Sequence, residues 1–335
     1  MDFINKILLQ AKGTKKKVVL PESIDERILK AADILLKQDI AQIIFVGNVE
    51  RIHQEAKNWG LNIEKAEIYD PFNNAINDRL IESFYEKRKH KGMDMAQAKF
   101  TILKSPLYYG AMLVDMGIAD AMVAGALCPT ADTLRALFHC IGLAEGVSLV
   151  SSFFVMISQH KEFGKDGITL FADCAVNPNP TAEQLADIAI DTAKSCKSFL
   201  EIEPRVALLS FSTYGSSAAP EVEKVQKALE ICKTKAPKFN IDGEMQVDAA
   251  LIKEIGQRKA KGSPVAGKAN CLIFPDLQSG NIGYKLTERF GNVKAVGPIL
   301  QGAKKPVNDL SRGCSIEDIV NVTALSVIQA LNNNQ

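Results

Sequence analysis

Residues 17–46 read KVVLPESIDERILKAADILLKQDIAQIIFV. The stretch begins with a short apolar run at Lys17–Leu20, continues through a helical period at Ser23–Gln38 and ends in a second apolar run at Gln42–Val46. Short runs rich in Val, Ile and Phe are typical of buried strands, whereas the middle segment spaces its apolar residues as a helix does. A strand, a helix and a second strand in this order indicate a parallel sheet covered by helices.

The same alternation continues along most of the chain. Further strands are predicted at Ala119–Ala124, Val147–Ile157, Ile168–Ala172, Arg205–Phe211, Cys271–Phe274 and Val293–Leu300. Further helices are predicted at Val49–Trp59, Thr181–Leu200, Pro220–Ala236 and Ser315–Leu331. We therefore predict an α/β fold with doubly wound sheets, and the 335 residues, of which 47% are hydrophobic, suffice for two such domains. The loops at residues 141–146 and near Gly291 are the candidate domain boundaries.

The composition excludes several classes of protein. A formal net charge of +1 gives no sign of a nucleic-acid surface. Seven cysteines without a CxxC pair suit a reducing cytosol and argue against disulfides or a zinc site. The N-terminal segment Met1–Lys12 reads as an amphipathic helix that is too short and too charged for a signal peptide, and no stretch has the apolar length of a membrane span. We expect a soluble, cytoplasmic protein.

The segment Pro306-Val-Asn-Asp-Leu-Ser-Arg-Gly-Cys-Ser-Ile-Glu-Asp318 carries the strongest functional signal. It is predicted as a loop, holding Asn308, Ser311 and Arg312, that leads into a helix near Ser315. A helix N-terminus favours anions, and Arg312 adds a planar fork of donors suited to a phosphate or a carboxylate. Asp318 has two interpretations that the residues leave open. It can act as a base beside a bound ligand, or it can close a capping box with Ser315.

Three other junctions between a strand and a helix resemble this one. The first, Gly125–Arg135, carries Thr130 and Arg135; the second, Phe211–Ser217, is rich in small residues and hydroxyls and carries Ser216; the third, Gln278–Gly283, opens a helix that carries Arg289. Each can be a plain helix cap, which is the more frequent role of such residues. Four such loops in one chain favour an elongated anionic ligand.

Two other motifs are rejected. Gly262–Ala269 nearly fits the phosphate-binding pattern GxxxxGK[ST], but it lacks the final Ser or Thr and precedes a strand instead of following one. The acidic run Asp242–Asp248 has no adjacent histidine, and the four histidines of the chain show no spacing typical of metal ligands. The sequence therefore predicts no nucleotide triphosphatase and no metal site.

Many separated segments of the chain resemble the phosphate acetyltransferases (phosphotransacetylases). The resemblance covers Lys17 to Ala330 and rests on Val19–Ser23, Asp25–Arg27, Arg88–Gly92, Asp120–Gly125, Thr130–Arg135, Asp173–Pro178, Leu209–Ser216, Asp242–Gln246, Ala269–Asn270, Phe274–Asp276 and Asn308–Cys314. It implies reversible acetyl transfer between acetyl phosphate and coenzyme A, which gives acetyl-CoA and inorganic phosphate.

The resemblance also implies an architecture. It is a fold like that of isocitrate and isopropylmalate dehydrogenases, with a cleft between two domains. The first domain would take residues 1–143 and 295–335, and the second would take residues 144–294 and carry the interface of a homodimer.

The resemblance assigns roles to individual residues. It makes Asp318 the base for the CoA thiol, Ser311 the group that orients the thiol, and Arg312 a stabiliser of the developing charge. It gives Arg88, Arg135 and Arg289 positions that bind phosphate or CoA. Thr130, Ser216 and Asn308, from the loops described above, are further candidates for substrate binding. A thiol with a pKa of about 8.5 needs such a base at neutral pH. Direct thiolate attack in a ternary complex requires no metal, cofactor or acyl-enzyme, because holding the two substrates together lowers much of the barrier.

Three alternatives have weaker support. A phosphate butyryltransferase would share the chemistry and differ in its acyl pocket. A non-catalytic acyl-CoA-sensing module would not need Ser311, Arg312 and Asp318, all of which are present. A decarboxylating dehydrogenase of the same fold would need an acidic metal cluster and a nicotinamide fingerprint, and the sequence contains neither.

Overall fold

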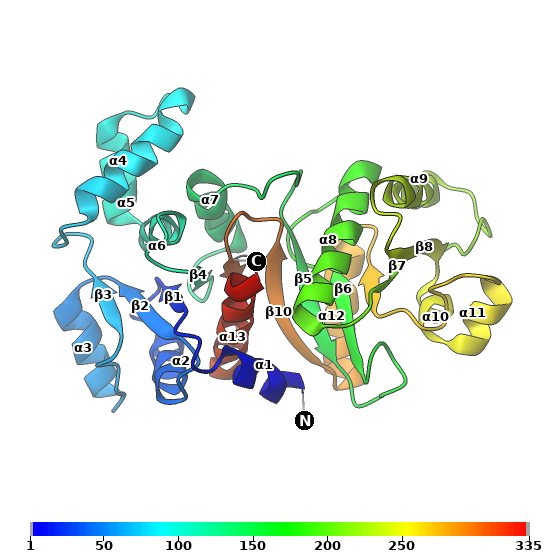
Figure 1. Cartoon of the computed structure of the whole chain (residues 1–335), viewed down its shortest axis with the longest axis horizontal. Helices are drawn as coiled ribbons and strands as arrows, with labels where there is room; N and C mark the ends of the chain where they lie inside the picture. The colour runs from blue at the N-terminus through cyan, green and yellow to red at the C-terminus, as the bar shows by residue number, and fades with distance from the viewer. Residues whose placement is uncertain (1–2, 333–335) are drawn as a thin grey trace. The chain divides into compact units, whose positions relative to one another are not determined.

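The computed structural model describes residues 3–332 and divides into two compact units (Figure 1). The first unit contains the chain up to Glu145 together with the segment from Ala303 onward, and the second unit is Gly146–Gly302. Each unit is built on its own sheet. No helix in residues 3–332 is long and apolar enough to cross a membrane.

The sheet of the first unit has five parallel strands in the order β11-β4-β1-β2-β3. The strands are β1 (Lys17–Leu20), β2 (Gln42–Val46), β3 (Glu67–Tyr69), β4 (Ala121–Ala124) and β11 (Val307–Asp309). The central strand β1 is buried from Val18 to Leu20, which is why it reads as a continuous apolar run. All five strands end at the same edge, so the loops that follow them gather there.

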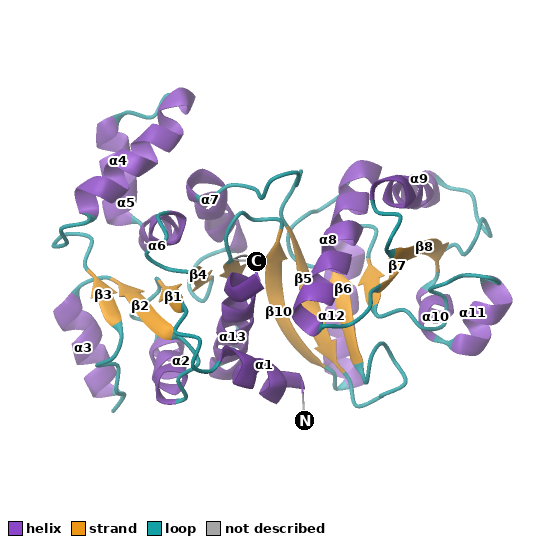
Figure 2. Ribbon diagram, in the orientation of Figure 1, coloured by secondary structure: helices purple, strands orange, loops and turns teal. Residues whose placement is uncertain are grey.

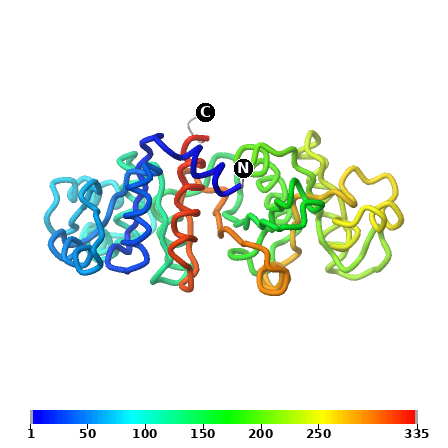
Figure 3. Tube along the Cα trace, turned by 90° about the horizontal axis from the view of Figure 1, so that it is seen from below, coloured from blue at the N-terminus to red at the C-terminus, as the bar shows by residue number. Residues whose placement is uncertain are grey.

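Helices lie on both faces of this sheet (Figure 2). They are α1 (Phe3–Ala11), α2 (Glu26–Lys37), α3 (Val49–Asn58), α4 (Asn77–Arg88), the 3-10 turn η1 (Lys89–Lys91), α5 (Met95–Lys104), α6 (Pro106–Asp115), α7 (Thr130–Cys140) and α13 (Ile316–Asn332). The last helix, α13, is almost wholly buried and packs beside α2 and the N-terminal helix α1 (Figure 3). The two ends of the described chain therefore belong to the same unit.

The sheet of the second unit has six strands in the order β10-β5-β6-β9-β7-β8. They are β5 (Ser151–Ile157), β6 (Ile168–Ala172), β7 (Arg205–Leu209), β8 (Asn240–Met245), β9 (Cys271–Ile273) and β10 (Lys294–Gln301). The helices of this unit are α8 (Ala182–Leu200), α9 (Pro220–Lys235), α10 (Val247–Leu251), α11 (Lys253–Lys259) and α12 (Leu277–Gly291).

This sheet is mixed, whereas the sequence predicted a parallel one. Strand β5 runs antiparallel to both β6 and β10, and the remaining pairs are parallel. The reason is local: only residues 158–167, which contain no helix, connect β5 to β6. A short connection of this kind reverses the chain, because a parallel pair needs a longer crossover. The prediction of an α/β fold is otherwise confirmed, and most strand pairs of the two sheets are parallel.

The second boundary between the units also differs from the expected one. Residues 295–302 were assigned to the first domain, yet Lys294–Gln301 forms β10 and pairs with β5 of the second unit. The chain leaves the second unit only after Gly302. The apolar run was therefore located correctly, but its pairing partner β5 lies 137–150 residues earlier in the sequence and could not be identified from the run itself.

Candidate active site

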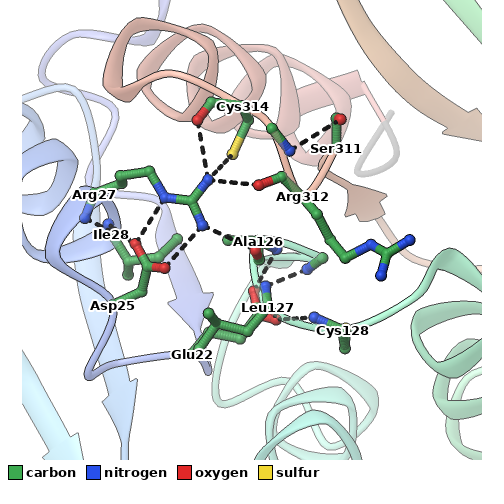
Figure 4. A network of polar contacts seen from close by, with 12 residues as sticks. Glu22, Asp25, Arg27, Ile28, Ala126, Leu127, Cys128, Ser311, Arg312 and Cys314 are labelled. Carbon is green, nitrogen blue, oxygen red and sulfur yellow. Dashed lines mark hydrogen bonds and ion pairs between the residues drawn. The ribbon is translucent and has the colours of Figure 1, made fainter.

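The loop between β11 and α13 is exposed at its tip. Ser311, Arg312 and Gly313 are exposed, and the Oγ of Ser311 accepts a 3.2 Å hydrogen bond from the Gly313 N–H. Within residues 3–332 the Arg312 guanidinium has no hydrogen bond or ion pair, and Figure 4 shows this side chain extended away from its neighbours. A guanidinium that is not committed to the protein is free to bind an anion.

Asp318 completes a capping box at the start of α13. Its Oδ2 accepts hydrogen bonds of 2.8 Å from both the N–H and the Oγ of Ser315, and the Asp318 N–H donates to Ser315 Oγ over 3.1 Å. The structural interpretation of Asp318 is therefore present in the molecule. The capping box does not exclude a role as a base, since a half-buried carboxylate that accepts two hydrogen bonds can still take a proton. The role of Asp318 as a base stays a prediction.

The loop after β4 is held by a buried carboxylate that the sequence analysis did not consider. Glu22, 8% exposed, accepts hydrogen bonds of 2.7–3.0 Å from the N–H groups of Gly125, Ala126, Leu127 and Cys128 (Figure 4). Four consecutive N–H donors form the kind of concavity that binds anions. Here the protein fills the concavity with its own carboxylate, so these four donors are not available to a ligand.

Thr130 and Arg135 were both predicted to bind substrate, and the structure places them differently. Thr130 begins α7, and its hydroxyl donates a 2.5 Å hydrogen bond to Oδ2 of Asp309. This bond connects α7 to β11. Arg135 is exposed one turn later, in a 2.8 Å ion pair with Asp132, its neighbour on the same helix. Exposed ion pairs are weak, so a phosphate can compete for Arg135.

Asn308, the third predicted residue of this region, is fully buried. It lies in β11, where its Nδ2 donates hydrogen bonds of 2.7 Å to Ser326 Oγ and 2.6 Å to Gln329 Oε1. Both acceptors belong to α13. The structure thus differs from the expectation: the Asn308 amide joins β11 to α13 inside the core and does not face an open surface.

Arg88 lies at the C-terminus of α4. Its Nη2 is 3.4 Å from His139 Nε2, and the other ring nitrogen of His139 is 2.9 Å from the Tyr108 hydroxyl. Burial and the nearby Arg88 charge lower the pKa of His139, so the imidazole stays neutral and can accept from Arg88. The Arg88 Nε is buried without a hydrogen-bond partner in the described part of the chain.

A cavity of about 630 Å³ opens beside Arg88. Its lining includes Lys91, Gln97, the exposed aromatic ring of Phe100 and Thr101. Cationic and aromatic groups around one opening suit a ligand that combines a phosphate with a flat ring.

The two predicted site residues of the second unit have simple surroundings within that unit. Ser216 follows β7, and its Oγ accepts a 3.0 Å hydrogen bond from the Thr213 N–H. Arg289 lies near the end of α12 and is highly exposed, 3.7 Å from the carboxylate of Glu288. Neither side chain is locked into the core, so both can contact a ligand.

The cysteines nearest to these loops are poor nucleophiles. Cys314 is buried, and burial raises the pKa of its thiol to about 11. Burial also raises the pKa of the Cys128 thiol to about 11. At neutral pH both side chains remain thiols, and the thiol is the unreactive form.

Comparisons with known proteins define first the class of fold and then the family. A 4-hydroxythreonine-4-phosphate dehydrogenase from Klebsiella pneumoniae superposes with a TM-score of 0.51, covering 96% of this chain and 100% of that one, at only 12% identity. This likeness shows a dehydrogenase-like fold and nothing about activity.

The closer matches are phosphotransacetylases. A phosphotransacetylase from Streptococcus pyogenes is 42% identical over 99% of both chains, with a TM-score of 0.93. A phosphate acetyltransferase from Thermoanaerobacterium thermosaccharolyticum is 53% identical, covering 98% of this chain and 100% of the relative. The profile described as phosphate acetyl/butaryl transferase matches residues 2–327. The chain belongs to the phosphate acetyl/butaryl transferase family, as its sequence motifs predicted.

Proposed function

We propose that this chain catalyses the reversible transfer of an acetyl group between acetyl phosphate and coenzyme A, giving acetyl-CoA and inorganic phosphate. The observation that carries the proposal is the exposed Ser311–Arg312 turn before α13, in a chain whose full-length relatives are named phosphate acetyltransferases. An uncommitted guanidinium beside a helix N-terminus suits a phosphate-bearing substrate.

The proposed reaction is a direct displacement in a ternary complex. The CoA thiol loses its proton to Asp318, and the sulfur forms a bond to the acetyl carbon. The bond from that carbon to the phosphate oxygen then breaks, and phosphate leaves with the electron pair. Ser311 orients the thiol, while Arg312 stabilises the charge on the carbonyl oxygen and on the leaving phosphate.

A direct route is favoured over an acyl-cysteine because Cys314 and Cys128, with pKa values raised to about 11, hold almost no thiolate at neutral pH. We also propose that no metal or cofactor takes part, since positioning of two substrates supplies much of the rate enhancement. Full activity after dialysis against a chelator is the expected result, and loss that is restored by a divalent ion would contradict it.

Arginine side chains bind the phosphate groups of the substrates in this proposal. Arg88 and Arg135 bind phosphates of CoA or acetyl phosphate, and the exposed side chains of Arg289 and Ser216 are further candidates for substrate contact. Thr130 and Asn308 are reassigned to structural roles, since both are hydrogen-bonded to the protein.

We further propose that two copies of the chain associate through α12. Ile282, Leu286 and Phe290 recur every four residues on this helix and are 57%, 51% and 88% exposed. A contiguous apolar stripe on a helix is typical of an interface. Phe290→Asp should convert a dimer to a monomer in sedimentation equilibrium, whereas Phe72→Asp, at an exposed site of the first unit, should not. A Phe290→Asp variant that remains a dimer would place the interface elsewhere.

The free cysteines of the described chain fit a reducing compartment, and we assign the protein to the cytoplasm.

Substrate competition tests the function. Purified protein should form acetyl-CoA from acetyl phosphate and CoA and prefer acetyl phosphate to butyryl phosphate in kcat/KM. Preference for butyryl phosphate would support the phosphate butyryltransferase alternative. CoA binding without turnover of either acyl phosphate would support the sensing module.

A further inference from the structure

Arg27 occupies a position that needs an explanation. It lies in the first turn of α2, after the capping residue Asp25, where a cation is unfavourable because it opposes the helix dipole. Asp25 offsets that cost, since its two carboxylate oxygens accept from Arg27 Nε over 3.1 Å and from Nη2 over 2.8 Å. The outer edge of the guanidinium remains for other partners.

Those partners are three backbone carbonyls in two distant loops. Arg27 Nη2 donates to the carbonyl of Ala126 over 2.9 Å, and Nη1 donates to the carbonyls of Arg312 over 2.8 Å and Cys314 over 3.1 Å (Figure 4). A guanidinium has five N–H donors. The two bonds to Asp25 and the three to carbonyls use all five, so Arg27 has no donor left for a substrate.

The Ser311–Cys314 turn depends on these bonds. Its own hydrogen bonds are the one from Gly313 N–H to Ser311 Oγ and the one from Cys314 N–H to the Ser311 carbonyl over 2.9 Å. Arg27 holds the carbonyls on both sides of Gly313 and thereby fixes the backbone from which the Arg312 side chain projects.

Glu22 anchors the other loop to the same segment of chain. Its carboxylate binds the four N–H groups of residues 125–128, and Arg27 Nη2 donates to the Ala126 carbonyl in the same loop. Residues 22–27 therefore connect the loop after β4 to the turn before α13. Their hydrogen bonds hold the backbone on either side of the Arg312 side chain.

We infer that Arg27 is a positioning residue for acyl transfer, which acts by holding the Ser311–Cys314 turn so that the Arg312 guanidinium meets the reacting phosphate. The inference rests on the proposed function. Displacement of a catalytic group by about 1 Å can cost roughly 100-fold in rate. Loss of Arg27 should therefore lower kcat and leave the KM for CoA nearly unchanged.

A double-mutant cycle with Arg312 tests the inference. Arg27→Met should lower kcat by about 10- to 100-fold, but by less than about 3-fold in an Arg312→Ala background, because residues that act as a unit are not additive. Arg51→Met, at an exposed site on α3, is the matched control and should leave kcat unchanged in both backgrounds, relative to wild type and to Arg312→Ala respectively. Equal losses by Arg27→Met in the two backgrounds, or a rise in the KM for CoA with kcat intact, would overturn the positioning role.

Amide hydrogen exchange provides a readout that does not depend on acetyl transfer. Arg27→Met should speed exchange at Gly313 and Cys314 more than at α3 or β2, with cooperative melting retained. Unchanged exchange in this turn would refute the inference even if wild type proves inactive with acetyl phosphate. Absence of activity in wild type with faster exchange in Arg27→Met would instead refute only the proposed function.

Discussion

The hydroxyl of Thr130 donates a hydrogen bond to Oδ2 of Asp309, and this bond ties the first residue of α7 to the last residue of β11. The carboxyl group of Asp309 is almost fully buried, and its Oδ1 has no hydrogen-bond partner within residues 3–332. Burial raises the pKa of Asp309 from its ordinary 3.8 to about 6. The residue lies two positions before Ser311, where the proposed active-site loop begins.

The raised pKa predicts how stability changes with pH. Because the folded protein holds the Asp309 proton more tightly than the unfolded chain, this group stabilises the fold below pH 3.8. That contribution is lost as the pH rises through about 6. Asp309→Asn keeps a neutral group, so its free energy of unfolding relative to wild type should rise by up to about 3 kcal/mol between pH 4 and pH 7.

Denaturant unfolding of both proteins at several pH values measures this difference. Glu50→Gln, at an exposed site on α3, is the control and should run parallel to wild type. A difference between Asp309→Asn and wild type that is constant with pH would mean that the carboxyl group is not held protonated.

Activity should depend on the shape of the cation at position 312 as well as on its charge. Arg312→Ala should lower kcat/KM for acetyl phosphate by about 100-fold or more. Arg312→Lys should recover only part of that loss, because an ammonium cannot donate two parallel hydrogen bonds to one phosphate. Steady-state kinetics of the three proteins decide the point, and equal losses in the two variants would exclude a two-pronged contact.

Asp318 should show two separable effects, since the structure places it in a capping box. Asp318→Asn should lower kcat by roughly 100-fold if the carboxylate is the base, and it should lower the free energy of unfolding by about 1 kcal/mol through the weakened cap. Ser315→Ala removes the cap and leaves the carboxylate. It should lose similar stability and keep most of its kcat. If both variants keep kcat, Asp318 is a cap alone.

The sequence was sufficient to predict the strands that consist of a continuous apolar run. Lys17–Leu20 and Gln42–Val46 form strands with the predicted bounds, because strands buried on both faces carry few polar residues. Strand β11 was read as loop. It is only three residues long and contains Asn308 and Asp309, and it exists because β4 offers it a parallel partner. Asn308 was therefore expected in a loop, whereas it lies buried in this strand.

The residues that hold the candidate site in place could not be predicted from the sequence either. Arg27 is 285 residues from Arg312, and Glu22 is 103 residues from Gly125. No local pattern indicates that a carboxylate will bind a distant run of N–H groups. The exposed Ser311 and Arg312 were identified because helix-start chemistry is local, whereas the residues that hold them are defined only by the tertiary fold.

The last prediction is that the acetyl group passes directly between the substrates, without an acetylated enzyme. Direct transfer never places the acetyl group on the protein, so labelled phosphate should not enter acetyl phosphate when CoA is absent. A covalent route through Cys314 would allow this exchange, because acetylation of the thiol would release phosphate and its reversal would take up the labelled ion. The buried Cys314 thiol, with its pKa raised to about 11, argues for the direct route.

Incubation of the protein with labelled phosphate and acetyl phosphate alone measures the exchange, and addition of CoA provides the positive control. Cys314→Ala should retain most of the wild-type kcat, because it removes only a long, 3.7 Å hydrogen bond from Arg27 Nη1 to Sγ. Cys140→Ala, at another buried thiol of the first unit, is the matched control for loss of packing. Rapid exchange without CoA that disappears in Cys314→Ala and persists in Cys140→Ala would establish an acyl-enzyme, and it would do so without altering the net reaction.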